Sequence, residues 1–248
     1  MSANNQSAQG GDNHINLYEP HVWKHHTKVA GLEWKNPVGT ASGTFQYAAV
    51  RWFYDVSQLG AVCTKGASPV PWEGNPSPRT AESPAANINA VGLQNPGIDH
   101  YLAEDLPKLK AAGAFVISNV AGHCDDDYAA VVEKLADSDA DMLEINVSCP
   151  NVSAGGMSVG TDPVALANLM DRLRPMTDKP MIVKLTPNVT DITEIARAAE
   201  ASGADAISLI NTLLGMAIDV KRRRPVLARV VGGFSGPAVK PVALRMVW

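Results

Sequence analysis

Short apolar runs alternate with helical patterns along this chain from residue 37 onward. The short runs are typical of buried strands, whereas apolar residues spaced three or four positions apart are typical of helices that pack on a sheet. Their alternation predicts repeated strand–helix units, and therefore an α/β fold built on a parallel sheet. The expected strands span residues 37–41, 61–65, 115–120, 142–147, 181–185 and 206–210, and the expected helices span residues 98–112, 129–136, 163–174, 192–202 and 238–248.

Aspartate and glycine residues mark several of the expected helix ends. Asp162 and Asp191 stand where a side-chain oxygen accepts hydrogen bonds from the first N–H groups of a helix. Gly113 and Gly203 stand where a helix ends in a left-handed residue, a conformation that favours glycine. These four residues bound the helices expected at 98–112, 163–174 and 192–202.

Six strand–helix units are expected, whereas eight units close a (β/α)8 barrel. We therefore expect a TIM-barrel fold with about six units present and the last two missing. Residues 17–36 predict an N-terminal β-hairpin at the base of the barrel, and the polar residues 1–16 predict a disordered leader. Residues 17–248 then form one incomplete barrel domain. The segments 68–97 and 215–237 are rich in turn-forming residues and are expected to be structured loops beside a binding site.

Composition excludes several classes of function. A net charge of -4 and a pI near 5.8 give no general attraction to nucleic acid, and the basic run at residues 221–224 is expected to be a solvated loop. The chain has no apolar stretch of the roughly 18 residues that span a bilayer, and no signal sequence, so we expect a cytoplasmic protein without a membrane anchor. Cys63, Cys124 and Cys149 lack metal-binding spacing. They are expected to be free thiols, and no metal is predicted.

Polar residues follow the expected strands and so converge on one mouth of the fold. Lys65 and Lys184 lie at two of these strand ends, together with several asparagines. With no acidic residue at the neighbouring strand ends, the two lysines predict an anionic ligand. Cys149 opens the loop after the expected strand at 142–147, although a lone cysteine is more often a packing residue.

Seven motifs at these positions together resemble those of the class 1 dihydroorotate dehydrogenases, over about residues 17–248. They are Ala-Ser-Gly at 41–43, Thr-Lys-Gly at 64–66, Glu-Gly-Asn-Pro at 73–76, the run at 89–97, Asn-Val-Ser-Cys-Pro-Asn at 146–151, Val-Lys-Leu at 183–185 and Gly-Gly-Phe-Ser-Gly-Pro at 232–237. The resemblance implies an FMN-dependent (β/α)8 enzyme that oxidises dihydroorotate to orotate in de novo pyrimidine (UMP) biosynthesis. Cysteine in the 146–151 motif is typical of class 1, whereas the membrane-associated class 2 enzymes have a serine base there.

The resemblance implies catalytic roles for three side chains. Cys149 would remove the proton from C5 of dihydroorotate while hydride leaves C6 for the flavin. An ordinary thiol titrates near 8.5, so this base requires surroundings that favour the thiolate. Lys65 would lie between flavin and substrate, and Lys184 would stabilise the negative charge of the reduced flavin.

The resemblance also implies two sets of binding residues. The flavin-binding positions are Ser42, Lys65, Gly66, Asn119, Asn146, Lys184, Ile210 and Gly236. The substrate-binding positions are Lys65, Asn89, Ala90, Val91, Gly92, Leu93, Asn146, Asn211 and Thr212, with Asn151 as a further candidate. Asparagine suits a pyrimidine because its amide offers an acceptor and two donors in one plane, although a single asparagine is equally often a turn residue.

Two further expectations concern electron transfer and completeness. The runs at 42–45 and 92–97 resemble those of the NAD-linked group, class 1B, which implies a homodimer joined by an iron–sulfur flavoprotein subunit that carries FAD and a 2Fe-2S cluster. The family holds the FMN phosphate after strands seven and eight, so we expect this chain to bind FMN weakly and to have weak activity or none. Two alternatives stay open: uracil reduction as in dihydropyrimidine dehydrogenase, and a non-catalytic remnant that serves as an interaction subunit.

Overall fold

The fold is built on a five-stranded parallel sheet. The computed structural model describes residues 26–148 and 159–248. The parallel strands are β3 (Val62–Cys63), β6 (Val116–Val120), β7 (Met142–Asn146), β8 (Met181–Lys184) and β9 (Ala206–Ser208), in the order β3-β6-β7-β8-β9. Each of them lies within a strand expected from the sequence, which confirms the α/β class.

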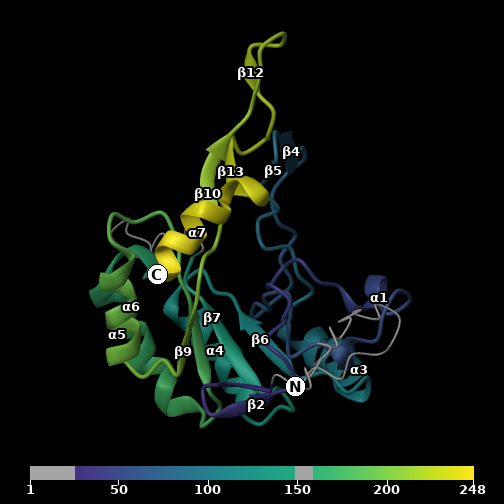
Figure 1. Ribbon diagram of the computed structural model, residues 1–248, viewed down its shortest axis with the longest axis vertical. Coiled ribbons are helices and arrows are strands. Elements are labelled where there is room, and N and C mark those ends of the chain that lie inside the picture. The colour runs from purple at the N-terminus through teal and green to yellow at the C-terminus, as the bar shows by residue number, and fades with distance from the viewer. Residues whose placement is uncertain (1–25, 149–158) are drawn as a thin grey trace, which may run out of the picture.

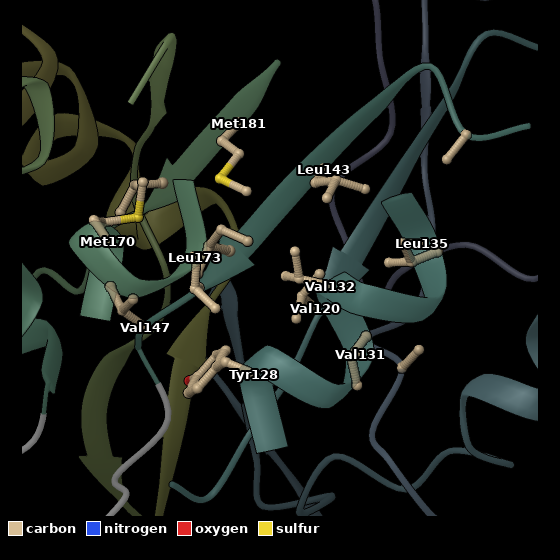
Figure 2. Packing of buried hydrophobic residues seen from close by; sticks show 14 of the residues in the cluster. Val120, Tyr128, Val131, Val132, Leu135, Leu143, Val147, Met170, Leu173 and Met181 are labelled. Carbon is tan, nitrogen blue, oxygen red and sulfur yellow. The ribbon is translucent and has the colours of Figure 1, made fainter. Parts of the chain in front are cut away.

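Helices cover one face of this sheet, because alternate residues of a strand point to opposite sides. The helices α4 (Asp125–Ala136), α5 (Pro163–Leu173) and α6 (Ile192–Ala201) pack there against Leu143 and Ile145 of β7. Figure 2 shows Tyr128, Val131 and Val132 of α4 and Met170 and Leu173 of α5 in this core.

The helix boundaries follow local chemistry. Asp162 and Asp191 cap α5 and α6 by accepting backbone N–H bonds, and Gly113 and Gly203 adopt positive φ values of 74° and 88°. The helix at residues 129–136 begins earlier than expected, at Asp125, since three aspartates in its first turn favour an N-terminus. The remaining helical segments are α1 (Tyr47–Val50), η1 (Val56–Gln58), α2 (Ile98–His100), η2 (Tyr101–Asp105), α3 (Leu106–Ala111), η3 (Val159–Thr161), η4 (Arg174–Met176), η5 (Pro237–Val239) and α7 (Lys240–Val247).

A β-hairpin covers the other face of the sheet at the amino ends of the strands. It consists of β1 (Thr27–Val29) and β2 (Leu32–Trp34), within the hairpin expected at 17–36, and lies at the lower end of Figure 1. Leu32 and Trp34 pack against a second apolar cluster, formed by Ala61, Cys63, Ile117, Met142 and Ile182. The hairpin thus closes the inner face from below. The leader expected at 1–16 lies outside the described residues.

The prediction of a strand at 37–41 is wrong, and the described parallel sheet has five strands rather than six. Its remnant is a single parallel bridge between Gly39 and Ala61. The pairing ends at Thr40 because its hydroxyl group, rather than its backbone, binds the backbone of Cys63. The Cys63 N–H donates to Thr40 Oγ1, and the Thr40 hydroxyl donates to the Cys63 carbonyl oxygen. The Thr40 side chain therefore replaces the backbone hydrogen bonds that a longer strand would form here.

The two segments expected to be loops instead form an antiparallel sheet. Its strands are β4 (Thr80–Ser83), β5 (Ala86–Asn89), β10 (Leu213–Met216) and β13 (Val231–Ser235), in the order β10-β13-β5-β4. β11 (Ile218–Asp219) and β12 (Arg224–Pro225) form a separate two-stranded hairpin that carries the exposed basic run, at the top of Figure 1. Glycine permits the packing: a Cβ atom at Gly233 would lie 2.2 Å from Thr212 Oγ1.

No helix in residues 26–148 or 159–248 is both long and apolar enough to cross a bilayer.

Candidate functional site

The inner face of the parallel sheet changes from apolar to polar toward the carboxyl ends of the strands. Above the apolar cluster that the hairpin covers, Glu144 of β7 accepts three side-chain hydrogen bonds. The donors are Asn119 Nδ2 of β6 at 2.6 Å, Ser208 Oγ of β9 at 2.9 Å and Cys63 Sγ of β3 at 3.3 Å. The four side chains are called the inner polar layer below.

A second set of polar contacts lies at the strand ends. Lys184 Nζ donates to Ser42 Oγ at 2.9 Å, and Asn211 Nδ2 donates to Asn146 Oδ1 at 3.3 Å. Ser148 links the two pairs, since its N–H donates to Asn146 Oδ1 and its hydroxyl donates to the Lys184 carbonyl oxygen. The structure therefore brings together four of the predicted site residues, namely Ser42, Asn146, Lys184 and Asn211. Cys149, the next residue after Ser148, lies outside the described residues, as does Asn151.

Gly66 is in close contact with Asn119 of the inner polar layer. A Cβ atom at Gly66 would lie 2.6 Å from Asn119 Oδ1, so any side chain there would displace the amide. The backbone of Asn119 is also fixed, because its N–H donates to Thr64 Oγ1 and its carbonyl oxygen accepts from Ala67 N–H. Two predicted flavin-binding positions thus form one rigid unit at the end of β3 and β6.

The predicted substrate residues of the 89–93 run begin at Asn89, the last residue of β5, and continue into the loop that follows it. Asn89 Nδ2 donates to the Gly233 carbonyl oxygen at 3.4 Å, on the same glycine that packs against Thr212. Ala90 N–H donates to the Arg79 carbonyl oxygen, and the Val91 carbonyl oxygen accepts from Asn75 N–H. The run completes its turn with positive φ values at Gly92 (76°) and Leu93 (53°).

The two remaining predicted flavin-binding residues have other neighbours. Ile210, directly before Asn211, packs against the large apolar core of the helix-covered face. Gly236 has a φ of 108° and lies against the turn between β4 and β5, where an added Cβ atom would be 3.0 Å from Ala86 Cα.

A cavity of about 940 Å³ opens beside the end of β3. Lys65, Gly66 and Val91 are the predicted site residues that line it, together with Trp72, Asn95 and residues of the helical segment 101–109. Its volume falls in the range of small-molecule and cofactor sites. The cavity does not reach Lys184, Asn146 or Asn211, so the two parts of the predicted site meet at Lys65 and Gly66. A smaller hollow of about 400 Å³ between residues 47–56 and Ala112 contains none of the predicted residues.

Sequence reasoning missed Glu144. The argument for an anionic ligand considered only the strand ends, whereas Glu144 lies two residues before Asn146 within the strand. Its side chain is 6% exposed and carries the hydrogen bonds of the inner polar layer. One signal was available, since a glutamate inside a run of otherwise apolar residues is a buried charge that requires partners.

Burial shifts the titration of two further side chains near the mouth. It raises the pKa of the Cys63 thiol well above the ordinary value, and the adjacent Glu144 carboxylate raises it further. Burial also raises the pKa of Tyr101 to about 12, against the opposing effect of its hydrogen bond with Ser118. Both groups are therefore protonated at neutral pH, and Cys63 is unsuited to act as a base.

The parallel sheet, with polar side chains at the carboxyl ends of its strands and a cavity beside them, defines an α/β protein with an enzyme-like site. The sequence matches the dihydroorotate dehydrogenase family over residues 24–248. The chain belongs to that family. It is 57% identical over 224 residues to a protein of Alkaliphilus metalliredigens, and 54% identical to one of Alkaliphilus oremlandii, both named dihydroorotate dehydrogenase B (NAD(+)), catalytic subunit. These matches cover 89% of this chain and 73% of each relative.

Proposed function

We propose that this chain is the catalytic subunit of an NAD-linked dihydroorotate dehydrogenase, an oxidoreductase that converts dihydroorotate to orotate in pyrimidine biosynthesis. The observation that carries the proposal is the identity of 51–57% to relatives of that name, over 89% of the chain. The mouth contains Ser42, Asn146, Lys184 and Asn211, to which we assign roles in flavin and substrate binding. The names of these relatives do not favour the alternative of uracil reduction.

The residues at the mouth fit FMN in three respects. Gly66 leaves no side chain between the backbone and Asn119, which lets a planar ring approach. Lys184 and Lys65 supply positive charge, and the cavity at Lys65 has the volume of a cofactor site. When bound, FMN supplies the acceptor for the hydride of the substrate. Ser42, Lys65, Gly66, Asn119, Asn146 and Lys184 would hold it, with Ile210 and Gly236 as further positions from the resemblance.

The proposed chemistry gives a separate role to each charged or nucleophilic group. Cys149 accepts the C5 proton of dihydroorotate, and Lys65 attracts the substrate carboxylate. Lys184 stabilises negative charge on the flavin side of the site, and its hydrogen bond to Ser42 holds the ammonium group in place. Cys149 follows directly on Ser148, whose two hydrogen bonds tie the start of the loop to β7 and β8.

The amides that we assign to substrate binding are held before any ligand arrives. Asn211 donates to Asn146, and its own Oδ1 accepts from Thr212 N–H at 2.8 Å. Because these groups are already fixed, binding a ligand costs less conformational entropy. The substrate would also be lined by the end of β5 and the loop that follows it, through Asn89, Ala90, Val91, Gly92 and Leu93.

Ligand-induced changes in the flavin spectrum test the substrate class. The purified protein is loaded with FMN, and orotate or uracil is titrated into it. We expect orotate to shift the flavin absorption at lower concentration than uracil, because only orotate carries a carboxylate for Lys65. A response to uracil with none to orotate would support the dihydropyrimidine dehydrogenase alternative instead.

The electron acceptor completes the proposal. The relatives are named as NAD(+)-type catalytic subunits, and we propose that electrons reach NAD through an iron–sulfur flavoprotein subunit with FAD and a 2Fe-2S cluster, joined to a homodimer of this chain in the cytoplasm. The test is turnover with fumarate or with NAD, in the presence and absence of that subunit. Rapid turnover with fumarate by the catalytic chain alone would contradict the assignment to the NAD-linked group.

A further inference from the structure

The buried carboxylate of Glu144 determines which way the amide of Asn119 points. A carboxylate without a proton can only accept hydrogen bonds, so the group that faces it must be the NH2 group of the asparagine. The distance of 2.6 Å from Asn119 Nδ2 to Glu144 Oε1 is that of a short, charge-assisted hydrogen bond. The amide oxygen of Asn119 consequently points the other way, toward Gly66.

That oxygen is available to a ligand. Among residues 26–148 and 159–248, no donor forms a hydrogen bond with Asn119 Oδ1, whereas the amide nitrogen and both backbone groups of the residue have partners. Gly66 adds no side chain that would cover it. An acceptor oxygen without a protein donor, on a residue that is only 1% exposed and lies against a glycine, suits a ligand that offers an N–H group, and the imide of an isoalloxazine ring is such a group.

The other partners of Glu144 hold the carboxylate itself. The Ser208 hydroxyl donates to Glu144 Oε2, and the Cys63 thiol donates to Oε1, the oxygen that also accepts from Asn119. With donors from three different strands, the carboxylate has little freedom to rotate and release Asn119. The orientation of one amide at the mouth is thus fixed by groups that do not reach the mouth.

We infer that Glu144 is a positioning residue of the FMN site: its carboxylate fixes the Asn119 amide in the orientation that leaves the amide oxygen available to an N–H group of bound flavin. The inference rests on the proposed function for the identity of the ligand. The inference goes beyond the proposed function because it gives a role to Glu144, which is not among the predicted site residues.

A reciprocal exchange of donor and acceptor tests this role. In Asn119→Asp, two carboxylates face each other, and we expect FMN affinity to fall by more than about tenfold. Adding Glu144→Gln restores a donor–acceptor pair with reversed polarity and still leaves an acceptor oxygen on residue 119. The double variant should therefore bind FMN about tenfold more tightly than Asn119→Asp alone. Glu144→Gln alone allows two amide orientations and should weaken binding by less than about fivefold.

The measurements are FMN fluorescence titrations up to millimolar concentration, with urea unfolding of each variant. Asp205→Asn is the matched control: it changes a hydrogen-bonded carboxylate at the amino ends of β8 and β9, whose partners are Arg174 and the Met181 N–H group, so FMN affinity should change by less than about twofold. If Asn119→Asp does not fold, recovery of a folded, FMN-binding protein by the second substitution supports the inference equally. A double variant that binds no better than Asn119→Asp, or fails to fold, overturns it. A wild-type protein that binds no FMN contradicts the proposed function and the inference together.

Discussion

The two faces of the parallel sheet have different compositions although they come from the same strands. On the helix-covered face, Leu143 and Ile145 of β7 are fully buried among apolar side chains. On the inner face, Glu144 of the same strand is the acceptor of the inner polar layer, and Asn146 forms a polar contact at the mouth. Alternate residues of β7 therefore have different roles, because one set contributes to stability and the other organises the site. Substitutions on the two faces should separate folding from binding and catalysis.

The largest effect is expected in the mouth itself. In the full-length enzyme, Cys149→Ala removes the proposed base, so dihydroorotate oxidation should slow by on the order of 10²–10⁴-fold while FMN stays bound. Steady-state assays of orotate formation measure this rate. Cys124→Ala, at an exposed thiol on the N-terminal side of α4, is the control and should retain full activity. Unchanged turnover in the Cys149 variant would remove that residue from the mechanism.

On the helix-covered face, Leu143→Ala should lower the free energy of unfolding by about 3 kcal/mol, because it leaves a cavity in the core. FMN affinity of the folded protein should stay the same, since Leu143 points away from the mouth. Urea unfolding and FMN titration measure the two quantities. Leu214→Ala, at a side chain that is 68% exposed, should change stability by less than about 0.5 kcal/mol. A loss of FMN affinity in Leu143→Ala that equals its loss of stability would contradict the division between the faces.

Lys184→Met tests the charge on the inner face. It should slow flavin reduction by on the order of 10²-fold, because a positioned positive charge no longer stabilises the developing negative charge. FMN occupancy should fall much less. Rapid mixing with dihydroorotate separates the rate of reduction from occupancy, and Lys240→Met, at an exposed lysine of α7, is the control. Equal losses of reduction rate and occupancy would show that Lys184 binds the flavin rather than assisting its reduction.

The smallest effect concerns pH. The pKa of Tyr101 is raised to about 12 in the folded protein, above the ordinary value of 10.0, so its contribution to stability is complete below pH 10. As pH rises from 10 to 12, the phenol ionises in the unfolded chain first, and the free energy of unfolding falls by about 1.4 kcal/mol per pH unit. The Cys63 thiol contributes with the same sign.

Tyr101→Phe isolates this contribution in unfolding experiments between pH 7 and pH 12. The variant should lose about 1 kcal/mol at neutral pH, since the hydrogen bond with Ser118 is gone, but it should show a shallower decline above pH 10. Tyr54→Phe, at an exposed tyrosine, should leave the slope unchanged. An identical alkaline slope in Tyr101→Phe and wild type would exclude the shifted phenol as the cause.

Periodicity and capping residues predicted the parallel strands and their helices well, because both signals are local. The antiparallel sheet was missed, since its strands are only four or five residues long and Asn89 pairs with Gly233 across 144 residues. The shortening of the first strand depends on the hydroxyl group of Thr40, and the hydrophobic periodicity of the sequence does not indicate that interaction. At the site, the strand ends indicated Ser42, Asn146, Lys184 and Asn211 correctly as neighbours. Glu144 was missed because its partners come from three other strands, and only the folded sheet brings them together.

The central claim is that this chain oxidises dihydroorotate with bound flavin. Anaerobic addition of dihydroorotate to the FMN-loaded protein measures it directly, because flavin absorbance and orotate can be followed in one sample. We predict that the oxidised flavin spectrum bleaches and that one orotate forms per flavin reduced. A flavin that stays oxidised with dihydroorotate, or that bleaches only with dihydrouracil, would contradict the account.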